Sequence, residues 1–242
     1  MQTKRICLWS GPRNVSTALM YAFGQRSDTQ ILDEPLYAHY LHVTDTIHPV
    51  RDEVLTSMET NGDTVIRDVI LGPCEKPVLF MKQMAHHLVD IDRSFMEKTV
   101  NVLLIRNPRE MLPSLANVIG IPKMKDTGFN IQVELLENLQ KKGQSPPILD
   151  SRELLLAPKK VLSKLCDRLD LPFEEAMLSW EQGGNPSDGV WAPYWYQNLH
   201  KSEGFAPYRP KTEPFPESLN DILSECQPYY DILSADAICA DS

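Results

Sequence analysis

Short apolar runs alternate with amphipathic stretches over most of the first 170 residues. The apolar runs predict strands at 6–9, 29–32, 77–82, 100–105 and 147–150. The amphipathic stretches, with apolar residues at helical spacing, predict helices at 14–25, 52–60, 88–98, 109–119, 130–142 and 158–169. Strands that are continuously apolar are typical of a parallel sheet covered on both faces. We therefore predict an α/β fold, a P-loop-type parallel sheet of about five strands with helices on both faces.

The segment 182–216 interrupts this alternation, because it is rich in Gly, Pro, Trp and Tyr and has no regular period. Its aromatic residues argue against a disordered linker, and ordered loops of this length usually cover or build a binding site. No internal repeat or linker divides the chain. We predict a single domain, 1–242, with a lid or binding loop near 182–216.

The charge of the chain narrows the class of partner. With 24 Lys and Arg against 33 Asp and Glu, the formal net charge is −9, so neither nucleic acid nor an anionic membrane surface is expected as a partner. A cleft can still hold a few cations for a small anion. An apolar content of 42% with 24% charged residues is typical of a globular protein.

The location of the protein is predicted from its apolar runs and cysteines. No apolar run reaches the roughly 18 residues of a membrane span, and the N-terminus enters a strand pattern without a leader, so we expect a soluble, unprocessed chain. The five scattered cysteines include no C-x-x-C and have no metal-ligand spacing to His. They favour a reducing, cytoplasmic compartment and no metal site.

The first chemical motif is the run SGPRNVST at 10–17, between the first strand and the first helix. A turn that brings small residues and the hydroxyls of Ser16 and Thr17 to a helix N-terminus offers free N–H groups to an anion. The run differs from G-x-x-x-x-G-K-[ST], because Ser16 stands at the second glycine and no Lys precedes the hydroxyls. The alternative is an ordinary helix start with hydroxyls in its first turn.

The second motif is Arg106 with Ser114, eight residues later. Arg106 follows the most apolar strand, and ligands of open α/β sheets bind at the carboxyl ends of strands. Arginine suits bidentate phosphate binding, and Ser114 lies about two helical turns further on. The alternative is a structural ion pair between Arg106 and a carboxylate.

Together, GPRNVSTAL and LLIRNPREMLPSL resemble the two cofactor signatures of the sulfotransferase superfamily, which transfers a sulfuryl group from 3′-phosphoadenosine 5′-phosphosulfate (PAPS). The family's late strand, helix and Leu-Pro turn have a counterpart in 147–158 and 171–173, so the resemblance spans roughly 5–180. It implies that Arg106 and Ser114 bind the 3′-phosphate. It also implies that the 5′-phosphosulfate is held by Arg13, Asn14, Val15, Ser16 and Thr17.

Two positions of the first loop depart from the family. Val15 stands where the family usually has glycine, and Arg13 where it often has lysine. A valine keeps the backbone further from a phosphate than a glycine would. Arg13 retains the positive charge in a different geometry.

The resemblance also implies catalytic residues. Arg13 is the first candidate for neutralising the leaving phosphate and Lys82 the second. For the base that activates the acceptor, Glu34 follows the second strand, where several branches of the family place a catalytic Glu; we expect Pro35 to hold Glu34 extended. The family's third strand commonly ends in Lys followed closely by His, but here His86 and His87 come two or three residues later than that pattern.

The aromatic run 189–205 stands where sulfotransferases carry a loop over the cofactor. By this resemblance Lys201, Ser202 and Gly204 reach the 3′-phosphate or the adenine. Trp191 and Trp195 either wall the acceptor site or pack the C-terminal part onto the fold.

The sequence thus predicts a PAPS-dependent sulfotransferase-like enzyme that acts on a hydroxyl or amine of a small-molecule acceptor and releases adenosine 3′,5′-bisphosphate. Two alternatives stay open. One is a P-loop kinase using ATP, for which the loop lysine and a Mg²⁺-binding Asp after an apolar strand are lacking. The other is a non-catalytic nucleotide-binding member of the same fold. Neither the acceptor nor the oligomeric state is specified by the sequence.

Overall fold

The computed structural model describes residues 3–44 and 46–240, and it is built on one parallel sheet with the strand order β2-β3-β1-β4-β5-β6. The strands are β1 (Lys4–Ser10), β2 (Thr29–Asp33), β3 (Val78–Met84), β4 (Val100–Ile105), β5 (Ile148–Asp150) and β6 (Ala237–Ile238). The predicted α/β class is confirmed. The sheet has six strands in place of about five, because the short β6 pairs with β5 at the edge.

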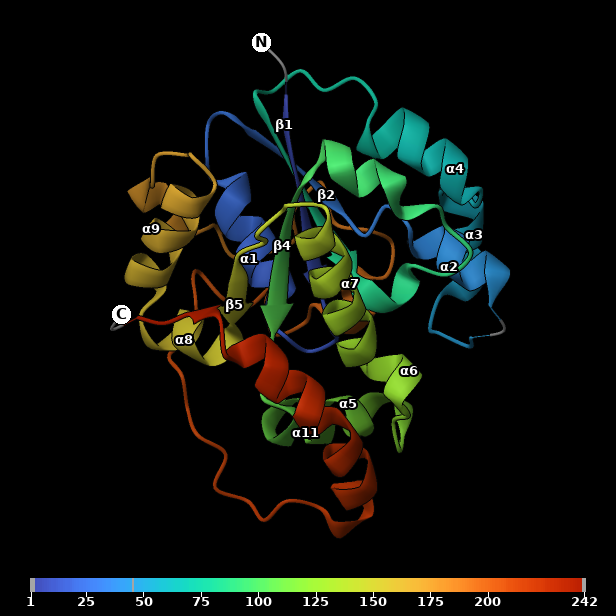
Figure 1. Cartoon of the computed structure of the whole chain (residues 1–242), viewed down its shortest axis with the longest axis vertical. Helices are drawn as coiled ribbons and strands as arrows, with labels where there is room; N and C mark the ends of the chain where they lie inside the picture. The colour runs from blue at the N-terminus through green and yellow to red at the C-terminus, as the bar shows by residue number, and fades with distance from the viewer. Residues whose placement is uncertain (1–2, 45, 241–242) are drawn as a thin grey trace.

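Both faces of the sheet are buried, as the continuous apolar strands predict. Along β1, Ile6 and Leu8 pack on one side, and Cys7 and Trp9 on the other. The first side is covered by α1 (Ser16–Gly24), α8 (Ser151–Leu156) and α9 (Pro158–Arg168). The second is covered by α5 (Pro108–Ile119), α7 (Phe129–Lys141) and α11 (Asn220–Ser234) (Figure 1).

Five of the six predicted helices are confirmed with ends shifted by a few residues, whereas the helix predicted at 88–98 is wrong. This stretch holds one 3-10 turn, Arg93–Lys98, and another, Ala85–His87, ends just before it. Asp90 is left-handed, with φ 49°, and the Asp92 carboxylate accepts hydrogen bonds from the backbone N–H and hydroxyl of Ser94. Such local bonds compete with helix formation.

The remaining helices are short. They are α2 (Tyr37–Val43), α3 (Arg51–Ser57), α4 (Gly62–Val65) with a π-helical turn (Ile66–Ile70), α6 (Met124–Thr127) and α10 (Ala192–Trp195), with 3-10 turns at Glu175–Leu178 and Glu217–Leu219. Within 3–44 and 46–240, no helix has both the length and the apolar character needed to cross a bilayer.

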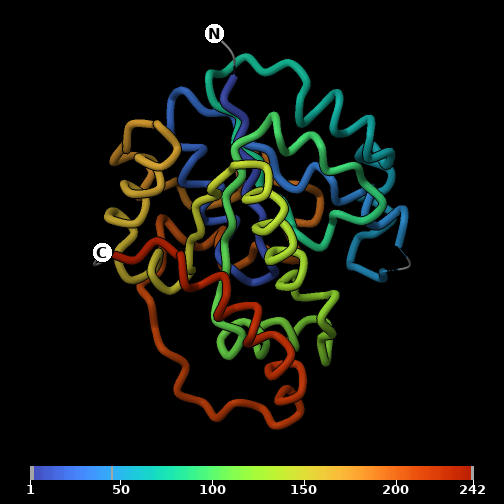
Figure 2. Tube along the Cα trace, viewed as in Figure 1, coloured from blue at the N-terminus to red at the C-terminus, as the bar shows by residue number. Residues whose placement is uncertain are grey.

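The strand order creates a crevice between β1 and β4. The chain leaves β1 toward β2, beyond β3, but leaves β4 toward β5 on the opposite side. Ligands of open α/β sheets bind where the connections diverge in this way. The carboxyl end of β4 points toward α5, α11 and the orange-red segment 206–216, which loops around that end of the molecule (Figures 1 and 2). The predicted site residues after β1, β2 and β4 therefore share one edge.

Candidate active site

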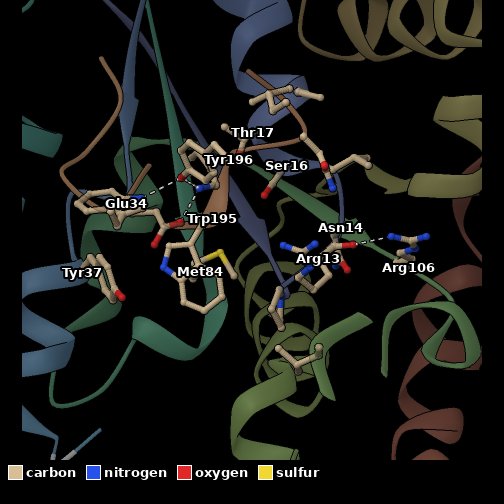
Figure 3. Close-up of a pocket in the computed structure, with 18 of the residues that line it drawn as sticks. Arg13, Asn14, Ser16, Thr17, Glu34, Tyr37, Met84, Arg106, Trp195 and Tyr196 are labelled. Carbon is tan, nitrogen blue, oxygen red and sulfur yellow. Dashed lines mark hydrogen bonds and ion pairs between the residues drawn. The ribbon is translucent and has the colours of Figure 1, made fainter. Parts of the chain in front are cut away.

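A cavity of about 350 Å³ lies at this edge of the sheet. Arg13 and Arg106 lie on one side of it, and Glu34 and Tyr37 on the other (Figure 3). Most sequence-predicted site residues line the cavity: Arg13, Asn14, Val15, Ser16, Thr17, Glu34, Lys82, His86, His87, Arg106, Ser202 and Gly204. Ser114 does not line it but contacts Arg13, and Lys201 is exposed away from it.

The loop after β1 is tied to the neighbouring strands. A guanidinium nitrogen of Arg106 donates to the carbonyl of Arg13 at 2.8 Å, and the amide of Asn14 donates to the carbonyl of Leu104 at 3.1 Å. The Ser151 hydroxyl donates to the carbonyl of Asn14 at 2.8 Å. Asn14 is buried and serves as an internal tether. These bonds fix the loop without a ligand.

Steric constraints also shape the loop. A Cβ at Gly11 would lie 2.6 Å from the carbonyl oxygen of Thr127, so only glycine fits there. Arg13 and Val15 are left-handed, with φ 60° and φ 58°. For a β-branched residue this conformation is strained, and strained backbone is concentrated at functional sites. Val15 thus occupies a backbone conformation that favours glycine, the residue that the family usually has here.

Helix α1 begins directly after Val15, and no side chain caps its first turn. Its first N–H groups and the positive end of its dipole are therefore available to an anion. Ser16 and Thr17 add hydroxyls at the same place and line the cavity.

The left-handed conformation of Val15 can be tested by stability. Val15→Gly and Val15→Ala both remove the packing of the side chain, but alanine is strained at positive φ. We expect the glycine variant to be the more stable by about 0.5 to 1 kcal/mol, the reverse of the order at ordinary positions. Chemical denaturation of the two variants measures the difference, and a more stable alanine variant would contradict the conformation.

The cationic side of the cavity is centred on two guanidiniums. The Nε of Arg13 donates to the Ser114 hydroxyl at 3.0 Å, and the Nε of Arg106 lies 3.4 Å from a carboxylate oxygen of Glu110. Burial and the charge of Arg106 lower the pKa of Arg13. The ion pair between Arg106 and Glu110 is thus present, but it is long and uses only one nitrogen of the guanidinium. Arg106 also lines the cavity.

Lys211, which the sequence analysis did not single out, is a third cation whose charge is felt at this side of the cavity. Burial and the charges of Arg106 and Arg13 lower the pKa of Lys211, and the charge of Glu110 opposes the shift. The side chain itself is exposed and does not line the cavity. The Tyr208 hydroxyl donates to Glu110 at 2.6 Å and holds this part of the loop against α5. Neither Lys211 nor the expected Lys201 lines the cavity, but the pKa of Lys211 responds to the charges of Arg106 and Arg13. In an irregular segment, sequence spacing does not determine which lysine faces inward.

The opposite side holds a buried polar network. The ammonium of Lys82 donates to Asp33 at 2.9 Å, to Tyr196 at 2.6 Å and to Glu34. The Tyr196 hydroxyl donates to Asp33 at 2.8 Å and accepts from the indole of Trp191 at 2.9 Å. Burial alone would lower the pKa of Lys82, but the carboxylates of Asp33 and Glu34 raise it well above its usual value. Lys82 is therefore a charged residue that is fully paired.

Glu34 does not have the extended backbone expected from Pro35, since its φ is 44°. Its N–H donates to the carbonyl of Lys82 at 2.8 Å, and its carbonyl accepts from the N–H of Tyr37 at 2.9 Å. These two bonds select the left-handed conformation over the preference of a residue before proline. Burial raises the pKa of Glu34, Lys82 opposes the shift and Asp33 adds to it. A raised carboxyl pKa is typical of a general base.

His87 lies beside Glu34 without bonding to it, and His86 packs edge-on against His87. His87 is stacked between Tyr37 and Tyr40, with ring centroids 4.9 and 4.6 Å apart, and its Nδ1 lies 3.9 Å from a Glu34 oxygen, beyond hydrogen-bond distance. Burial and neighbouring charges lower the pKa of His87 well below its usual value, and burial with His48 lowers that of His86 to about 3. Both rings are neutral near pH 7.

Aromatic residues form the remaining wall. The Tyr37 hydroxyl is 2.7 Å from Nδ1 of His48, and the buried Trp191 packs edge-on against Tyr37 at 5.0 Å. Trp191 is thus both core and site wall, while Trp195 is less buried and lines the cavity. Sequence reasoning missed Tyr37, His48 and Tyr196, because α2 has no strong helical pattern and the other two lie in irregular segments.

Two curated relatives from Arabidopsis thaliana, branched-chain-amino-acid aminotransferase-like proteins 2 and 1, are each 41% identical to this chain over 226 residues. The match covers 93% of this chain and 40% of each relative, so the chain spans less than half of their length. Their names describe those longer proteins.

Solved sulfotransferase structures share the fold. The sulfotransferase domain from the curacin biosynthetic pathway superposes with a TM-score of 0.54 at 16% identity, covering 98% of this chain and 99% of that one. A sulfotransferase from Alicyclobacillus acidocaldarius gives 0.54 at 12% identity, covering 97% and 96%. The family profile described as "Sulfotransferase domain" matches residues 4–237. The chain therefore belongs to the sulfotransferase domain family.

Proposed function

We propose that this protein transfers a sulfuryl group from PAPS to a hydroxyl or amine of a small-molecule acceptor. One observation carries the proposal: a single cavity joins a cationic loop at an uncapped helix start to a buried carboxylate with a raised pKa. The first part suits an anionic donor and the second suits proton removal from an acceptor. Membership of the family supports a transferase.

The residues of the cationic side fit PAPS. The start of α1 with Arg13, Ser16 and Thr17 offers N–H, guanidinium and hydroxyl donors for the 5′-phosphosulfate. Arg106 and Ser114 offer donors for the 3′-phosphate, and Ser114 is also the partner of Arg13. This donor set lacks the loop lysine that Mg²⁺-ATP requires, and the residue after β4 is Arg106 in place of a Mg²⁺-binding Asp.

When bound, PAPS supplies a sulfuryl group attached to a phosphate that leaves readily. Arg13 lies where it can neutralise the charge on that phosphate, and the tethered loop holds it there without rearrangement. Glu34 lies across the cavity and removes the proton of the acceptor. Lys82 keeps Glu34 in place, because its ammonium is fully committed to the buried network.

The acceptor side favours a neutral or cationic compound with apolar surface. Tyr37, Tyr40 and Trp195 provide aromatic surface, and the neutral histidines add no charge. Asp126 also lines this cavity, and the two carboxylates around Lys82 exceed its single positive charge. An anionic acceptor would meet repulsion there.

Ligand stabilisation separates the candidate functions. Adenosine 3′,5′-bisphosphate is expected to stabilise the fold by about 2.7 kcal/mol at a hundredfold excess over its Kd, and AMP much less, since AMP cannot use the contacts at Arg106. Thermal unfolding with each nucleotide measures this. Equal shifts from both, or a larger shift from ATP with Mg²⁺, would overturn the proposal. Bisphosphate binding with no sulfate transfer to a broad panel of acceptors would indicate the non-catalytic alternative.

A further inference from the structure

The buried network contains one ammonium for two carboxylates. Lys82 is 2% exposed at its side chain, and Asp33 and Glu34 are 1% and 10% exposed, so water screens none of the three strongly. A carboxylate that had this ammonium to itself would have its pKa depressed and would be a poor base. Asp33 prevents that arrangement, because it binds the same ammonium from the neighbouring strand β2.

Tyr196 fixes the position of the Lys82 ammonium relative to Asp33. Its hydroxyl donates to one oxygen of Asp33 while the ammonium of Lys82 donates to the other, so the three groups form a closed ring of hydrogen bonds. The indole of Trp191 donates to the same hydroxyl and holds it in place. The backbone N–H of Gly189 reaches Asp33 at 3.4 Å. The segment 182–216 therefore completes a network whose other members are Asp33 at the end of β2, Glu34 just after it and Lys82 in β3.

Building on the sulfotransferase function proposed above, we propose that Asp33 and Tyr196 are positioning residues, which share the Lys82 ammonium with Glu34 and keep it from pairing with Glu34 alone, so that the Glu34 carboxylate stays available for the acceptor proton. Neither residue needs to touch substrate. Through Tyr196 and Trp191 the aromatic run helps to position the base as well as lining the cavity.

Charge balance supports this role. Lys82, Asp33 and Glu34 sum to one negative charge, so a proton transferred to Glu34 brings the buried group to neutrality. The other titratable groups facing Glu34 are Tyr37, Tyr196 and His87, and their shifted pKa values keep all three neutral. Protonation of Glu34 thus removes a buried charge, which low dielectric favours.

The test is Asp33→Asn, which keeps the shape and removes the competing charge. Lys82 then pairs with Glu34 alone, so the pKa of Glu34 falls. We expect the acidic limb of kcat/KM to move to lower pH by about one unit or more, with kcat reduced about tenfold and bisphosphate affinity within about twofold of wild type. Carbon-13 NMR titration of the Glu34 carboxyl, assigned with Glu34→Gln, reads the same shift without turnover.

Tyr196→Phe provides a second variant that removes one oxygen. It is expected to shift the Glu34 titration in the same direction by a smaller amount, whereas Tyr194→Phe, a matched change at an exposed ring, leaves titration and kcat unchanged. A Glu34 titration that is unmoved or moves to higher pH in Asp33→Asn would overturn the proposal. Absence of transfer by the wild-type protein would overturn the proposed function alone, because the titration is read without turnover.

Discussion

Glu34→Gln is expected to lower sulfuryl transfer by roughly 10²- to 10⁴-fold while binding of adenosine 3′,5′-bisphosphate is retained. The amide is nearly isosteric with the carboxyl group but cannot accept the proton of the acceptor. Glu34 also lies across the cavity from Arg13 and Arg106, so the change leaves the cationic side intact. The measurement is transfer of labelled sulfate from PAPS to an acceptor found by screening, alongside bisphosphate titration.

The raised pKa of Glu34 also predicts how the rate of sulfuryl transfer changes with pH. Burial raises the pKa of Glu34, and the base must be deprotonated to act, so the wild-type rate falls as the pH drops through that raised value. In Glu34→Gln this fall of the rate at low pH is expected to be absent, because the amide does not titrate. Its residual rate is expected to be flat over the same range.

The histidines serve as the comparison. His86→Ala and His87→Ala are expected to reduce turnover less than Glu34→Gln, because neither ring bonds to Glu34 and both are neutral. His87 is stacked between two tyrosines, so its variant is compared at equal folded fraction. Retained turnover in Glu34→Gln together with loss in one histidine variant would move the base to that histidine.

The parts of the site that follow regular strands could be predicted from the sequence. Once the apolar runs predict a parallel sheet, residues just after the strands share one edge, and Arg13, Glu34 and Arg106 all line one cavity. Lys82 is at the same edge through β3. The physical reason is that strand direction and period fix where these positions lie, whatever the loops do.

Residues in irregular segments could not be placed in this way. Lys201 and Lys211 are both exposed lysines of one long segment, and only the folded path of that segment determines that the charges of Arg106 and Arg13 act on Lys211. Tyr196 likewise reaches Lys82 through tertiary packing of α10. Predictions from local backbone preference were also wrong where specific hydrogen bonds opposed that preference. Glu34, which precedes a proline, is left-handed, and the hydrogen bond from Ser94 to Asp92 replaces the helix predicted at 88–98.

Arg106→Ala is expected to weaken binding of adenosine 3′,5′-bisphosphate by an amount on the order of 2 to 4 kcal/mol, the cost of losing a charge-assisted contact. That is about 30- to 1,000-fold in Kd. Arg106 also donates to the carbonyl of Arg13, so loosening of the loop is expected to weaken AMP as well, but only a few-fold. Isothermal titration with the two nucleotides separates the effects, because only the bisphosphate carries the 3′-phosphate.

Glu110→Gln tests the same contact from the other side. Glu110 competes for the guanidinium of Arg106 through the ion pair at 3.4 Å, and its charge also opposes an incoming phosphate. Removing that charge should tighten bisphosphate binding several-fold and leave AMP nearly unchanged, because the tie between Arg106 and Arg13 is kept. If Arg106→Ala weakened both nucleotides equally and Glu110→Gln changed neither, Arg106 would be a structural ion-pair residue, and the 3′-phosphate would have to bind elsewhere in the cavity.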